Sequence, residues 1–320
     1  MSPIWISVTN NIAGGLRTES SDMPFFINLR DQRLGQQVVV EISPTGDRVS
    51  AKAQVNASDA LVQALRLTPP EKNLPQNLEA EVLNAVGSLS LASHRVLRLL
   101  QQETQDHSLL PHNELLGIDG GFQWSNDDTD WKRLPLHGGS IAVSMHMLGR
   151  LDSRLLKTVQ AALDNDEMPL LAYEHLYQAE RSQGLRFKWI EATTAAELAV
   201  KEILIKIAPD LRPLLEQLPS PPIRKLYGTI LEAYSGQRSP HLNALADGAE
   251  RRNKLIHQPE DIRLDHQEVL DYLSTVTSAI RHLLELYRSL RDNAGQTVGD
   301  DPPEPAAPAN ASYTVNHSGT

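Results

Sequence analysis

A short basic run carries the residue types that could do chemistry on a phosphate ester. It is the sequence ERRNKLIHQP, residues 250–259, which holds Arg252, Asn253 and His257 just before a proline. A histidine near neutrality can act as a general base or acid. Guanidinium groups bind phosphate through forked donors and stabilise negative charge that develops on it. The run therefore indicates cleavage of an RNA phosphodiester, with the ribose 2′-hydroxyl as nucleophile and without a metal.

The spacing within this run limits how the two main residues could work together. Arg252 and His257 are five residues apart, which places them about 140° apart around an ideal helix. They cannot share one helical face. Two arrangements would bring both to one substrate: the helix loosens around His257 ahead of Pro259, or a second copy of the chain brings its own run alongside. The negative end of a helix would also favour a protonated imidazole at His257.

The neighbours of this pair have supporting roles in the same interpretation. Asn253 would hydrogen-bond a ribose, a phosphate or the second chain, and Arg251 and Lys254 would bind the substrate. A structural interpretation competes with this one. Arg and Lys are common near helix C-termini, where they complement the dipole, and an isolated histidine is more often a surface or capping group. Spacing alone leaves both interpretations open.

The segment Arg252-Asn253-Lys254-Leu255-Ile256-His257 resembles the R-N-x-x-x-H form of the motif that marks HEPN domains. Its setting is similar too, because the motif ends the penultimate helix of a helical unit that a long amphipathic helix closes. The resemblance covers roughly residues 170–292. It implies an all-α HEPN-like bundle that dimerises with the two motifs at the interface. In many members it also implies metal-independent RNA cleavage that leaves a cyclic phosphate.

The resemblance also assigns residues and a biological setting. It implies that Arg252 and His257 are the catalytic pair and that Asn253 is a polar auxiliary. Some members have an acidic residue on an earlier helix, for which Glu197 is the candidate; a surface glutamate paired with Lys201 at i+4 is an equal interpretation. The setting would be a defence or toxin system, with RNA as substrate and an antitoxin or regulatory protein as partner. Other members do not cleave RNA, so a non-catalytic scaffold that binds a protein or nucleic acid is the alternative function.

Composition narrows the class of protein. The net charge of -10, with 40% hydrophobic and 22% charged residues, is typical of a soluble globular protein and argues against extensive sequence-independent binding to duplexes. No run approaches the roughly 18 apolar residues that span a bilayer, and the N-terminus lacks the pattern of a secretory signal. We therefore expect no membrane association and a cytoplasmic location. With no cysteine and no H-E-x-x-H pattern, no metal or other cofactor is expected.

Residues 1–165 have the pattern of an α+β domain of unknown family. The expected elements are strands over 5–9 and 24–29, a hairpin over 37–55, a helix over 78–103 and a second small hairpin around 122–133. We expect the aromatic residues of this part to lie in its core rather than to stack on bases; they are Phe25, Phe26, Trp124 and Trp131.

The rest of the chain has a mainly helical pattern. Residues 166–292 have the pattern of the helical bundle, with proline-marked breaks between helices. Its last helix begins with Asp265 and Glu268 at capping-box spacing. Residues 293–320 are rich in Pro, Gly, Ala, Asn and acids, and we expect a disordered tail there.

Overall fold

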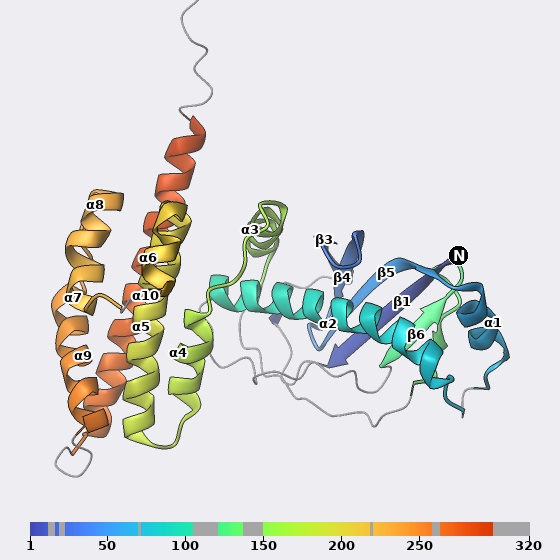
Figure 1. The fold of residues 1–320 in the computed structure, drawn as a ribbon, viewed down its shortest axis with the longest axis horizontal. Coiled ribbons are helices and arrows are strands. Elements are labelled where there is room, and N and C mark those ends of the chain that lie inside the picture. The colour runs from blue at the N-terminus through green and yellow to red at the C-terminus, as the bar shows by residue number, and fades with distance from the viewer. Residues whose placement is uncertain are drawn as a thin grey trace, which may run out of the picture.

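The computed structural model describes residues 1–11, 17–18, 23–69, 72–104, 121–136, 150–217, 220–257 and 263–296. An antiparallel sheet with its helices forms the N-terminal part, and the remainder is mostly helical (Figure 1). The expected disordered tail lies outside the described residues from residue 297 onward. Residues 293–296, the first four of the expected tail, belong to the last helix, so the expected boundary at residue 293 was wrong.

The sheet has six strands in the order β3-β4-β5-β1-β6-β7. They are β1 (Ser2–Asn11), β3 (Phe25–Asp31), β4 (Gln36–Ile42), β5 (Arg48–Ala57), β6 (Phe122–Ser125) and β7 (Lys132–Arg133). Both expected hairpins are confirmed, because β4 pairs antiparallel with β5 and β6 pairs antiparallel with β7. Gly46, with φ at 68°, makes the first turn, a conformation that glycine adopts without steric strain. A separate parallel pair joins β2 (Arg17–Thr18) to β8 (Arg150–Leu151).

One long helix, α2 (Gln76–Thr104), covers a face of this sheet (Figure 1). Alternate strand residues point toward it and are buried, including Ile4 and Ile6 of β1 and Val40 of β4. The apolar stripe of α2 packs against them, as its periodicity predicted. Leu91 is an exception at 48% exposure, because it lies two residues from the buried Leu89 and so about 200° around the helix.

Two helices of the N-terminal part were not anticipated. The helix α1 (Asp59–Leu67) begins at Ser58, whose side chain accepts a hydrogen bond from the Leu61 amide, and α3 (Ser153–Asp164) begins at Asp152 in the same manner. Both are short.

The expectation for the aromatic residues is confirmed in part. Trp124 is 2% exposed and belongs to the core, whereas Phe26 is 53% exposed. Phe26 precedes the buried Ile27 in β3, so the pleat turns its side chain to the opposite face of the sheet.

The helical part consists of helices that stand side by side near the C-terminal end of α2, at a steep angle to it (Figure 1). They are α4 (Ala172–Arg181), α5 (Leu185–Ile207), η1 (Pro209–Leu211), α6 (Arg212–Gln217), α7 (Ile223–Lys225), the π-turn η2 (Leu226–Ile230), α8 (Leu231–Ser235), α9 (Leu242–His257) and α10 (His266–Gln296). One cluster of buried apolar residues extends from Ile4 to Leu163 and another from Leu170 to Leu286. The division expected at residue 165 falls between these clusters, and the assignment of two domains stays a prediction.

The last helix starts at the expected place but is capped by one residue rather than two. Asp265 accepts hydrogen bonds from the amides of Gln267 and Glu268, at 2.9 and 3.3 Å. The Glu268 carboxylate pairs with Arg251 at 2.6 Å instead of reaching back to complete a capping box. The helix continues four residues past the expected end at residue 292, to Gln296, because no proline occurs before Pro302.

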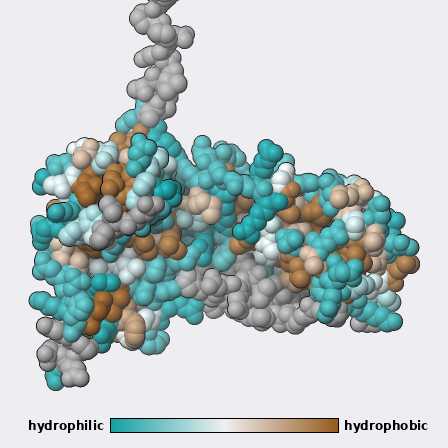
Figure 2. Space-filling model, viewed as in Figure 1, coloured by the Kyte–Doolittle hydropathy of each residue, from teal (hydrophilic) through white to brown (hydrophobic). Residues whose placement is uncertain are grey.

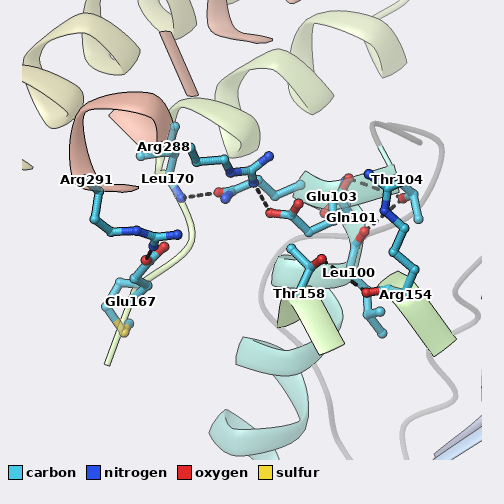
Figure 3. Close-up of polar contacts among 12 residues, drawn as sticks. Leu100, Gln101, Glu103, Thr104, Arg154, Thr158, Glu167, Leu170, Arg288 and Arg291 are labelled. Atoms are coloured by element: carbon cyan, nitrogen blue, oxygen red, sulfur yellow. Dashed lines mark hydrogen bonds and ion pairs between the residues drawn. The ribbon is translucent and has the colours of Figure 1, made fainter. Parts of the chain in front are cut away.

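The C-terminal end of α2 joins the two parts through polar contacts (Figure 3). Arg288 of α10 forms an ion pair with Glu103, and the Leu170 amide donates a buried hydrogen bond to the Gln102 side chain at 3.1 Å. Arg291 reaches Glu167 in the connecting segment. The Glu103 side chain is 8% exposed, and burial raises its pKa despite the opposing charge of Arg288. Burial and the pair with Arg288 thus act on the Glu103 carboxyl in opposite directions, and burial has the larger effect.

A close approach at Gly248 fixes α9 against α5 and α10. The indole Nε1 of Trp189 donates to the Gly248 carbonyl at 2.9 Å, and the Trp189 ring stacks on Tyr272 with 4.2 Å between centroids. A Cβ atom at residue 248 would lie 2.1 Å from the Tyr272 ring, well inside van der Waals contact. Only glycine allows this spacing, so it sets the orientation of the basic run on α9.

The face in Figure 2 is mainly hydrophilic and carries separate hydrophobic patches over both parts. Among the described helices, none is long and apolar enough to cross a bilayer.

Substituting Gly248→Ala should lower the free energy of unfolding by about 1–3 kcal/mol, because the new methyl group collides with Tyr272. Gly87→Ala is the matched control: it lies in α2 with open space around its Cβ, and it should raise the same quantity by roughly 0.5–1 kcal/mol. Urea unfolding would measure both. Equal effects of the two substitutions would contradict the close approach.

Substituting Arg288→Leu should lower the free energy of unfolding by about 2 kcal/mol at neutral pH, less than the ~3–5 kcal/mol of a fully buried pair because Arg288 is 37% exposed. The folded-state pKa of Glu103 is raised, so protonation favours the folded state, and the loss should shrink as the pH falls through this pKa. Thermal unfolding over a pH series measures the effect. Adding Glu103→Leu should recover most of the stability at neutral pH. If the loss caused by Arg288→Leu changed neither with pH nor on adding Glu103→Leu, the stabilising role of the ion pair would be contradicted.

Candidate functional site

The basic run forms the last turns of α9, which makes a ridge between two surface depressions. One depression, of about 460 Å³, lies on the side of Arg252 and Asn253 and is called here the Arg252 depression. The other, of about 520 Å³, lies on the side of Arg251 and Lys254. Glu250 contributes to both. Neighbouring residues of a helix point about 100° apart, which is why one run supplies two different sites.

Arg251 is held by structural contacts on its side of the ridge. Its guanidinium makes two hydrogen-bonded contacts with the Glu268 carboxylate, at 2.6 and 2.8 Å. It also lies over the Trp189 ring, 5.3 Å from the centroid. A guanidinium held by a carboxylate and an aromatic face has few donors left for a substrate. The structure thus gives Arg251 a structural role, and its expected substrate binding remains untested.

Arg252 is much less engaged. Within the part of the chain that the structure describes, its one hydrogen bond runs from Nη1 to the Asn253 carbonyl oxygen Oδ1, at 3.2 Å. It is partly buried and lines the Arg252 depression. Its remaining donors therefore face a cavity in which an anion could be bound.

Glu197 of α5 also lines this depression and interacts with several groups there. Its Oε1 accepts hydrogen bonds from Lys201 Nζ at 2.8 Å and from the Ser220 hydroxyl at 2.5 Å. Burial acts to raise the pKa of Glu197, but these two hydrogen bonds and the charges of Lys201 and Arg252 outweigh it and lower the pKa. The carboxylate is therefore ionised at neutral pH. The i+4 pair with Lys201 and the position near the motif are both observed, so the two interpretations of Glu197 coexist.

His257 is the final residue of α9 and is exposed. It belongs to the described lining of neither depression. Because α9 stays α-helical through His257, the arrangement in which the helix loosens around this residue is not observed. One copy of the chain thus brings Arg252, Asn253 and Glu197 together, but not His257.

The sequence pattern did not indicate that Ser220 and Arg224 belong to the Arg252 depression. Ser220 precedes α7 and Arg224 is within it, and both lie more than twenty residues before the motif in the chain. The prolines at 221 and 222 signalled a helix start, but no local spacing links that start to α9. Only the packing of α7 against α9 brings them to Arg252.

The arrangement can bind an anion and place it near an ionised carboxylate and a hydroxyl. It has the donors for phosphate and the acceptors for a ribose hydroxyl. Among the described residues, no group of three or more His, Asp or Glu side chains is placed to hold a metal ion.

Comparisons with known proteins bear on the family. No protein-family model matches this chain, and no curated protein or solved structure was found to resemble it. The resemblance to HEPN domains consequently stands on the motif and its helical setting.

Proposed function

We propose that the chain is a metal-independent endoribonuclease whose helical part is a HEPN-like bundle, acting in the cytoplasm. The observation that carries the proposal is the state of Arg252: its guanidinium lines a cavity, is barely engaged by the protein, and lies in the motif R-N-x-x-x-H. The neighbouring Arg251 has the same guanidinium group, but it is ion-paired with Glu268. This difference between two adjacent arginines supports a ligand-binding role for Arg252.

The reaction assigns each group a role. His257 takes the proton of the ribose 2′-hydroxyl, and the 2′-oxygen attacks phosphorus. The bond from phosphorus to the 5′-oxygen breaks, a 2′,3′-cyclic phosphate forms, and the leaving oxygen takes a proton from solvent. Arg252 stabilises the negative charge that develops on the phosphoryl oxygens, and Asn253 orients Arg252 through its side-chain carbonyl.

The site is shared between two copies of the chain. Arg252 and His257 lie about 140° apart around α9, a regular helix, so a single copy presents them to different sides. A twofold dimer brings His257 of the partner subunit to the Arg252 depression. This is the arrangement that the HEPN resemblance implies.

The remaining residues support this centre. Glu197 balances the charge of Arg252 and holds Ser220 at the edge of the depression. Lys254 is exposed on the other side of the ridge, beside Arg251, and adds positive charge for an RNA strand. The N-terminal part would regulate the activity in a defence or toxin system, with an antitoxin or regulatory protein as partner.

Purified protein in EDTA should cleave mixed-sequence RNA and leave ends with cyclic phosphate. His257→Ala should slow cleavage by roughly 10²–10⁴-fold, the usual contribution of a general base. Arg252→Gln should slow it by roughly 10²–10³-fold. His266→Ala, an exposed histidine at the start of α10, is the matched control and should cleave like the parent. Intact RNA with every folded variant would instead favour the non-catalytic scaffold that binds a partner.

Mixing two inactive variants tests the shared site. Arg252→Gln and His257→Ala chains, unfolded together and refolded, should regain about one quarter of the parental activity, because half of the dimers are mixed and each has one intact site. Native mass spectrometry would establish the mixed dimer. A mixed dimer without activity, or a parent that is monomeric with and without RNA, would rule out the shared arrangement.

A further inference from the structure

Arg224 is a second arginine with weakly held donors in the Arg252 depression. It is the middle residue of α7 and is 54% exposed. Its Nη1 lies 3.4 Å from Asn243 Oδ1, and its Nη2 lies 3.7 Å from Asp247, which is itself 75% exposed. A long ion pair between exposed groups contributes little to stability, so a better acceptor can replace it.

The two arginines lie at different points along α9. Arg224 contacts α9 at Asn243 and Asp247, and Arg252 lies five residues beyond Asp247 on the same helix. Asp247 and Arg252 are thus about 7.5 Å apart along the helix axis. Both arginines line one depression, so they could contact different phosphates of one strand.

The carboxylates nearby leave room for such a ligand. Glu197 is already balanced by Lys201 and hydrogen-bonded to Ser220. Glu250 is exposed on the ridge, where solvent and salt screen its charge. Among the described residues Arg252 has no ion pair, and Arg224 has only the long pair with Asp247.

We propose that Arg224 binds the phosphate next to the scissile one, so that the RNA strand crosses the depression from α7 to the end of α9. This inference rests on the proposed ribonuclease function and adds the binding of a neighbouring nucleotide to it. Arg224 is a positioning residue and touches no reacting atom.

The test is equilibrium binding of a labelled single-stranded RNA in which every 2′-hydroxyl is methylated, so that it cannot be cleaved. Arg224→Gln in the full chain should weaken binding roughly tenfold at low salt. It should also reduce the slope of log affinity against log salt by about 0.7, the value for one phosphate contact to a single strand. In cleavage, KM for long RNA should rise more than kcat falls. KM for a dinucleotide, which has one phosphodiester, should change less.

Arg238→Gln is the matched control, since Arg238 is 55% exposed, pairs with Glu232 and does not line the depression. It should leave the salt slope unchanged. If Arg224→Gln keeps the parental slope while Arg252→Gln reduces it, the second phosphate contact is refuted and the ribonuclease proposal stands. If the folded parent neither binds nor cleaves RNA, both fail.

Discussion

The close packing of α9 against Trp189 and Tyr272 is the constraint on which the candidate site depends. It requires a residue without a side chain at Gly248, and it places the next turn of α9 against α5 and α10 in one orientation. Arg251 then falls over Trp189 and within reach of Glu268. One residue later, helical geometry turns Arg252 toward the opposite depression. Two adjacent arginines are thereby separated into a structural one and an accessible one.

Local charge balance explains how a protein with a net charge of -10 can keep a cationic site. The ionised Glu197 makes its hydrogen bonds to Lys201 and Ser220 rather than to Arg252, so its charge is shared between Lys201 and Arg252. Asn253 contacts Arg252 through a neutral amide, which orients the guanidinium without cancelling its charge. The charge at Arg252 therefore remains available, even though acidic side chains outnumber basic ones in the whole chain.

Much of the fold was readable from local patterns, but the site was readable only in part. Alternating β-branched residues gave the β4–β5 hairpin, and the apolar stripe gave α2, because both elements bury one face along a continuous stretch of chain. The helices α1 and α3 were missed although each is amphipathic and begins after a good N-cap residue, Ser58 or Asp152. The motif on α9 was found from its residue types. The places of Arg224 and Ser220 in the site and the ion pair of Arg251 were not found. Each depends on contact between segments that are far apart in sequence.

The junction at the end of α2 has a mechanical consequence. The Glu103–Arg288 pair and the hydrogen bond from Leu170 to Gln102 connect the helix that lies on the sheet to the helices that carry the basic run. Both contacts involve groups that are costly to leave unpaired in a nonpolar environment. Removing either partner would leave its buried counterpart unpaired at the boundary, so these few side chains contribute to holding the bundle against the end of α2.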